Sequence, residues 1–243
     1  MPLSCPIVRV PTNQTLQSED EIKDFSLLLS PDYGTGEAKA ISPSHQNSEL
    51  HPSSVFLEYD QAGELSLLID TKRLTLRNVE FSDAENLYQH LFGNEVAMEK
   101  YADTIPYDMK RVLGRIEKWK ELQEAGDPFG ALVVHRRESE EFLGLVMISH
   151  GSKPGVAEIA YIFRQEAWGN GYGKEAACAL VEHLAPLLRD HGYEIGGKIL
   201  HALEATVRPD NPASGKILRR LGLTLARQEQ MYGATRDIYV QDI

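Results

Sequence analysis

Three alternating glycines lie between an apolar segment and an alanine-rich one. The run is Trp168-Gly169-Asn170-Gly171-Tyr172-Gly173-Lys174-Glu175-Ala176. Glycine lets the backbone approach a ligand with no Cβ in the way, and the free N–H groups and dipole of a first helical turn attract an anion. The run predicts a loop that binds a pyrophosphate at a helix start, although a tight strand-to-helix turn without a ligand fits a lone glycine loop equally well.

The spacing of these glycines excludes a dinucleotide site. The Rossmann pattern requires G-x-G-x-x-G, and this chain has G-x-G-x-G. That pattern also places an acid at a strand end about 20 residues further on. The only acid at a suitable distance, Asp190, lies in a polar segment.

A second segment completes the pattern. It reads Arg208-Pro209-Asp210-Asn211-Pro212-Ala213-Ser214-Gly215-Lys216-Ile217-Leu218-Arg219-Arg220-Leu221-Gly222-Leu223. Asn211 followed by Pro212 predicts a helix start, with asparagine as the N-cap and proline at the first helical position. The two segments together resemble the GNAT N-acetyltransferase family. The resemblance is closest to the ribosomal-protein N-terminal acetyltransferase branch, which is also similar at Arg73–Arg77 and Asp83–Tyr88, and it covers the chain from about Lys72 to the C-terminus.

The resemblance implies acetyl-CoA as co-substrate. In that family the glycine loop binds the pyrophosphate, and the Asn-x-x-Ser helix lies beside the pantetheine arm. The residues then implied in binding acetyl-CoA are Tyr161, Ile162, Phe163, Trp168, Gly169, Asn170, Gly171, Tyr172, Gly173, Lys174, Asn211 and Ser214. As a large aromatic residue, Trp168 is expected to pack under the loop. Lys174, Lys216, Arg219 and Arg220 are candidate partners of the 3′-phosphate, although cations on exposed helices are usually solvated.

The reaction implied is attack of a primary amine on the acetyl thioester. A lysine amine with a pKa of ~10.4 is about one part in a thousand neutral near pH 7.4, whereas an α-amine near ~7.8 costs well under 1 kcal/mol to deprotonate. A protein N-terminus therefore needs only a weak base. Glu158 is the candidate for this base, because similar proteins often place an acid near the amine at the head of this strand; a solvated residue at a strand start fits Glu158 equally well. His150 is the alternative base, although a surface histidine at a strand end is the more common case.

The proton donor for the departing thiolate is not defined by the sequence. Many family members carry a tyrosine acid where this chain has Leu218. Ser214 or water is left for the role, and the other interpretation of Ser214 is that it completes the helix cap.

The hydrophobic pattern predicts an α/β fold, and the resemblance implies a GNAT-like mixed, mainly antiparallel central sheet with helices on both faces. We expect residues 72–243 to form the acetyltransferase domain, and residues 1–71 to form an N-terminal arm and an added β-hairpin over Ser54–Tyr59 and Glu64–Ile69. Within the domain, Ser82 to Glu85 predicts a capping box, Met109 to Leu122 an amphipathic helix, and Pro186 the end or a kink of the helix from Gly171.

The composition limits the partners and the location. A formal net charge of -11 argues against nucleic acid, and a cationic amine acceptor suits it better. Cys5 and Cys178 suggest no disulfide framework, which indicates a reducing cytoplasm, and no apolar run is long enough to span a membrane. No Cys/His cluster shows metal-ligand spacing, so we expect no metal. The oligomeric state is not predicted.

Three functions fit these observations. The first is acetylation of a protein N-terminal α-amine by acetyl-CoA. The second is acetylation of a small amine such as a polyamine or an antibiotic. The third, in which catalysis is absent, is an acetyl-CoA-binding module whose arm before Lys72 contacts a partner. The acceptor is chosen by loops and helices whose composition carries no code, so the sequence does not decide between them.

Overall fold

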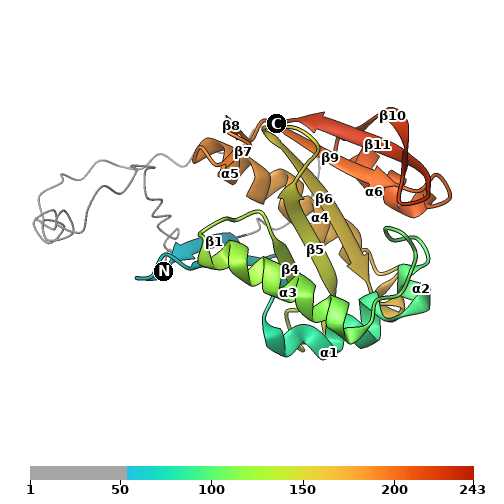
Figure 1. Cartoon of the computed structure of the whole chain (residues 1–243), viewed down its shortest axis with the longest axis horizontal. Helices are drawn as coiled ribbons and strands as arrows, with labels where there is room; N and C mark the ends of the chain where they lie inside the picture. Colours follow the sequence, from blue (N-terminus) through green and yellow to red (C-terminus); the bar gives the residue numbers. More distant parts are fainter. Residues whose placement is uncertain (1–53) are drawn as a thin grey trace, which may run out of the picture. The chain divides into compact units, whose positions relative to one another are not determined.

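The computed structural model describes residues 54–243, which form one large sheet with helices on both faces (Figure 1). The strands that enter this sheet are β1 (Ser54–Tyr59), β2 (Leu65–Asp70), β3 (Leu74–Asn78), β4 (Ala131–Arg136), β5 (Phe142–His150), β6 (Val156–Phe163), β9 (Ala202–Val207), β10 (Thr224–Met231) and β11 (Ala234–Asp242). A separate small hairpin joins β7 (Glu194–Ile195) and β8 (Lys198–Ile199). The predicted arm before Ser54 lies outside the described residues.

The sheet order is β1-β2-β3-β4-β5-β6-β9-β11-β10. All neighbouring pairs are antiparallel except β6 and β9. The predicted mixed, mainly antiparallel fold is therefore confirmed. The predicted hairpin is also present, and β2 pairs with β3, so the hairpin extends the central sheet at its edge.

Helices cover both faces of the sheet. The helical segments are α1 (Ala84–Leu87), α2 (Glu95–Met98), α3 (Met109–Glu124), α4 (Tyr172–Cys178), α5 (Ala185–Asp190) and α6 (Pro212–Arg220). One buried cluster joins α3 and the α1 region to the sheet through Leu87, Val112 and Ile116, and the other joins α4 and α5 to it through Ala176, Leu180 and Leu188. These two apolar layers hold the central strands, which are buried on both faces.

Two local predictions need correction. The capping box is formed by Glu80 and Asp83, at the start of the 3-10 turn Phe81–Asp83, instead of by Ser82 and Glu85. The Asp83 carboxylate accepts the Glu80 amide at 2.8 Å, and both terminal nitrogens of Arg77 donate to it. Leu113, predicted on the apolar face of α3, is 40% exposed.

Of the two outcomes predicted for Pro186, an end or a kink of the helix, the end does not occur. A π-helical turn at Ala179–Leu184 precedes Pro186, and α5 continues to Asp190 with the proline in its first turn. Among the helices of residues 54–243, none is long and apolar enough to cross a membrane.

Candidate functional site

A pocket opens where two parallel strands separate. β6 and β9 pair only over Val156–Glu158 and Ala202–Glu204, although both strands continue beyond this point. The separated ends line a pocket of about 280 Å³, together with residues from α6 and from the segment around Tyr101–Tyr107. On its other edge β6 stays paired with β5 as far as Phe163. The edge of β6 that faces β9 is therefore free of strand pairing after Glu158.

Successive side chains at the end of β6 lie on opposite faces of the sheet. Ile162 is buried against the α3 side of the sheet, and Phe163 is buried in the cluster that contains α4. Only their backbone groups are left for a ligand. Tyr161 differs, because its side chain is partly buried and lines the pocket.

The glycine loop has the backbone geometry that the sequence predicts. Gly169 and Gly171 have φ values of 76° and 80°, in the left-handed region that favours glycine, and Gly171 is the N-cap of α4. Within the described part of the chain, the backbone amides of residues 169–174 donate no hydrogen bond. These donors lie together at the start of a helix, which is the arrangement that binds phosphate oxygens.

The loop is fixed by contacts that the sequence did not indicate. Arg73, the residue before β3, pairs with Glu175 at 2.6 Å, donates to the Asn170 carbonyl at 3.0 Å, and places its guanidinium 4.6 Å from the centre of the Tyr172 ring. Glu175 also accepts the Thr71 hydroxyl at 2.7 Å. Arg73 is about 100 positions from the loop, so no local pattern could have identified it.

Trp168 has a different role from the one expected. Its side chain is 48% exposed and its indole N–H donates to the Phe163 carbonyl at 2.8 Å. The residue therefore connects the loop to the end of β6 while much of its ring stays at the surface.

The start of α6 brings two hydroxyl groups together beside the pocket. The Asn211 side chain accepts the Ser214 amide at 3.2 Å, so the predicted cap is confirmed. The Ser214 hydroxyl lies 2.8 Å from the Tyr161 hydroxyl, and burial raises the pKa of Tyr161 to about 12. Leu218 is 1% exposed and also lines the pocket. The Tyr161 phenol of β6 thus lies in the region where Leu218 replaces the tyrosine acid of similar proteins and cannot donate a proton.

Glu158 lies at the point where the strands separate. It pairs in register with Ser149 of β5 and Glu204 of β9, and its carboxylate accepts the Thr206 hydroxyl at 3.4 Å. Burial, followed by the charge of Glu204, raises the pKa of Glu158, while Thr206 and Arg236 act in the opposite direction. A carboxylate with a raised pKa is a stronger base than an ordinary one.

His150 lies elsewhere. It ends β5, its side chain is half exposed, and its Nε2 is 3.2 Å from the Asp127 carboxylate. It does not line the pocket that contains Glu158. The geometry therefore favours Glu158 over His150 as the base.

The four cations suggested for the 3′-phosphate differ in their contacts. Arg219 donates to the Tyr239 hydroxyl at 2.7 Å and is already engaged within the fold. Lys216 and Arg220 are exposed on α6, and Lys174 is half-buried in the first turn of α4. Lys174 is thus the one that shares a helical turn with the glycine loop.

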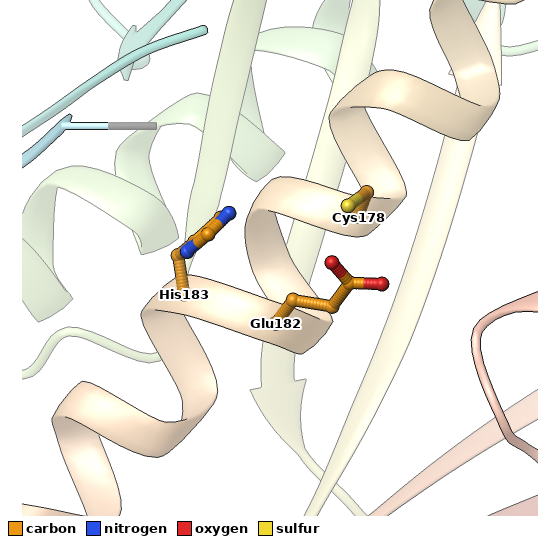
Figure 2. A group of neighbouring side chains, drawn as sticks. All are labelled: Cys178, Glu182 and His183. Atoms are coloured by element: carbon orange, nitrogen blue, oxygen red, sulfur yellow. The ribbon is translucent and has the colours of Figure 1, made fainter. Parts of the chain in front are cut away.

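One group of side chains has the composition of a metal site. The Cys178, Glu182 and His183 side chains extend from adjacent turns of one helix (Figure 2), and their ligand atoms lie within 4.8 Å of one another. The sequence did not indicate this group, because the π-helical turn changes which positions share a face. Burial and a hydrogen bond with Glu182 raise the pKa of the Cys178 thiol to about 12. A protonated thiol is a poor metal ligand, so the expectation of no metal stays a prediction.

The comparisons with known proteins identify the family. A family model for the acetyltransferase (GNAT) domain matches residues 73–224. The chain is 30% identical over 177 residues to the N-acetyltransferase p20 of Bacillus licheniformis, and this match covers 70% of this chain and 92% of the relative. The chain belongs to the GNAT N-acetyltransferase family. The resemblance that the sequence suggested is thereby confirmed.

Two solved structures show that the GNAT fold matches. One is RimL, a ribosomal L7/L12 α-N-protein acetyltransferase in complex with coenzyme A, with a TM-score of 0.57, 19% identity, and coverage of 71% of this chain and 96% of that chain. The other is MccE, a microcin C7 self-immunity acetyltransferase in complex with acetyl-CoA and AMP, with a TM-score of 0.55, 19% identity, and coverage of 71% and 94%. At this identity the likeness concerns the fold; one of these proteins is named for a protein acceptor and the other for self-immunity to microcin C7.

This GNAT protein has the features that acetyl-CoA requires. The free amides of residues 169–174 suit a pyrophosphate, and the unpaired edge of β6 suits an extended chain of amides such as pantetheine. Family membership makes the protein an acetyl-CoA-dependent N-acetyltransferase and favours this function over a non-catalytic module.

Proposed function

We propose that this enzyme acetylates an α-amine, most simply the N-terminus of a protein or peptide, with Glu158 as the base. The observation that carries the proposal is the charge inventory of the pocket. Only two acids line it, and one of them, Asp103, pairs with Arg111 at 3.3 Å. Glu158 is therefore the one carboxylate of the pocket that forms no ion pair with any of residues 54–243.

A single weak base suits an α-amine. Near neutral pH an α-amine with a pKa of ~7.8 is partly unprotonated, whereas a lysine amine at ~10.4 costs about 4 kcal/mol to deprotonate. Glu158, directly or through one water, accepts the proton that the amine loses on attack. Acetyl-CoA supplies the thioester, whose carbonyl carbon forms the new bond to nitrogen and loses its bond to sulfur.

The hydroxyl pair beside the pocket supports the departing sulfur. Ser214 and Tyr161 lie 2.8 Å apart, and either hydroxyl can donate toward a developing anion. This pair does the work that a tyrosine at the Leu218 position does in similar proteins. Ser214 thus keeps its predicted role, and Tyr161 gains one as its hydrogen-bonding partner.

The test compares two peptides of identical sequence, one with the α-amine blocked and the other with its single lysine side chain blocked. CoA release and product mass are measured near pH 7.5. We expect kcat/KM to be higher for the peptide with the free α-amine. A preference for the lysine amine, or activity with free polyamines alone, would contradict the α-amine assignment and leave the acetyl-CoA site unaffected.

The cytoplasmic location inferred from the two cysteines belongs to the same proposal, since nascent N-termini are exposed there.

A further inference from the structure

Two arginines in the pocket have no acidic partner. Arg115 of α3 and Arg236 of β11 both line it. Within residues 54–243, no carboxylate oxygen lies within 4.0 Å of either guanidinium group, and the Nε atom of each is buried without a hydrogen-bond partner. A buried charge is costly unless it is paired, so an unpaired guanidinium in a ligand pocket indicates an anionic ligand group.

Of the two arginines, Arg236 is the more deeply buried. It is 2% exposed, and its one hydrogen bond goes to the backbone carbonyl of Ala102. Its guanidinium lies 5.4 Å from the centre of the Tyr232 ring. Burial, followed by the charge of Arg208, lowers the pKa of Arg236, and the smaller effects of Tyr232, Asp210 and Asp103 in the opposite direction do not offset this.

Arg115 is held by aromatic rings instead of acids. Its guanidinium lies 5.0 Å from the centre of the Trp119 ring and 5.6 Å from that of Phe92, and its closest polar contact is the Met147 sulfur at 3.8 Å. Cation–π contacts position a guanidinium without neutralising it, and they leave its edge free for a carboxylate.

The other cations of the pocket are already paired. Lys100 pairs with Asp210 at 2.9 Å and with Glu99 at 3.2 Å, and Arg111 pairs with Asp103 at 3.3 Å. After these pairs are set aside, Arg115 and Arg236 stand opposite Glu158 alone. The pocket thus has an excess of positive charge, although the whole chain has a net charge of -11.

We propose that the acceptor carries a carboxylate close to its reactive amine, and that Arg115 and Arg236 bind this carboxylate while the amine meets Glu158. This inference rests on the proposed function. A volume of about 280 Å³ lies just below the usual range of ligand sites, so the amine and the carboxylate belong to one residue. The acceptor class is therefore an acidic residue with a free α-amine, either at the start of a peptide or as a single amino acid.

The test uses matched acceptors. One arm compares peptides that begin with Asp or Glu against the same peptides beginning with Asn or Gln. A second arm compares the single-residue α-amides of Asp and Asn, which shows whether one acidic residue is a sufficient acceptor without the rest of a peptide. Hydrogen bonds to charged groups contribute about 1.5–3 kcal/mol, so we expect kcat/KM to favour each acidic acceptor by about 10- to 100-fold.

Variants assign this preference to the two arginines. Arg236→Gln should lower kcat/KM for the acidic acceptor at least tenfold more than for its neutral partner, and Arg115→Gln should act in the same direction. The matched control is Arg227→Gln, which removes one cation from an exposed pair with Glu229 on β10, outside the pocket, and should keep the full preference. Because Arg115 is only half-buried, it decides the result if Arg236→Gln fails to fold.

Two results would overturn the inference. One is an equal kcat/KM for acidic and neutral acceptors with the parent enzyme. The other is an equal loss for both acceptors in Arg236→Gln and Arg115→Gln, which would make the arginines structural. In either case α-acetylation of the neutral peptides would still support the proposed function, whereas failure to acetylate any α-amine would contradict the proposed function itself.

Discussion

Gly171 provides a direct test of the acetyl-CoA loop. Its φ of +80° is in the region that L side chains rarely adopt, and a Cβ built there meets nothing closer than the Arg73 guanidinium at 3.5 Å. Space is therefore available, and the cost of Gly171→Val is backbone strain. An L residue in this region costs about 1–2 kcal/mol, which for a domain of this size lowers Tm by about 2–8 °C.

The matched control is Gly192→Val. Gly192 follows α5, has a φ of +75°, and a Cβ there meets nothing within 4 Å. We expect both variants to lose a similar amount of stability. Only Gly171→Val changes the direction of the loop amides, so only this variant should lose acetyl-CoA affinity.

The assay is thermal unfolding with and without acetyl-CoA. At about 100 times the dissociation constant, a ligand adds about 2.7 kcal/mol to the free energy of unfolding, or about 5–11 °C in Tm for a domain of this size. The parent and Gly192→Val should show this full shift, and Gly171→Val a small fraction of it. A folded Gly171→Val protein with the full shift would refute the assignment of the loop.

Two further predictions concern Glu158 and the cysteine group. Glu158→Gln should lower kcat/KM about 10²-fold or more with little change in acetyl-CoA binding, and in the parent kcat/KM should fall with decreasing pH through a pKa above that of an ordinary glutamate. A raised pKa of Glu158 contributes to stability only at pH values where Glu158 is protonated, so Glu158→Gln should not lower Tm at pH 7. An equal kcat/KM for the parent and Glu158→Gln over the pH series would make Glu158 a structural residue. A chelator should change neither Tm nor activity, and elemental analysis of the purified protein should find no stoichiometric zinc, because a metal would first have to displace the proton of the Cys178 thiol, whose pKa is raised by burial and by Glu182. A zinc content near one per chain would contradict this.

The sequence by itself determined the elements and the family. Local patterns placed the hairpin before Lys72, the helix from Met109, the glycine loop and the Asn211 cap, because periodicity, turn residues and capping depend on residues close together in the chain. The local predictions that were wrong concern choices that tertiary contacts decide. The capping box forms at Glu80 and Asp83, where Arg77 holds the carboxylate, and Leu113 of α3 is exposed.

Only the tertiary structure decided which side chains meet in the pocket. Tyr161 reaches Ser214 across 53 positions, Arg73 supports the loop from about 100 positions away, and Arg236 comes to the same pocket as Arg115 from β11. These residues lie on different strands and helices, and their spacing in the sequence carries no information about their distance in space. The net charge of -11 likewise suggested a cationic acceptor, whereas burial and pairing leave two uncompensated arginines inside the pocket. Composition averages over the whole surface, and a site depends on the few charges that the fold removes from water.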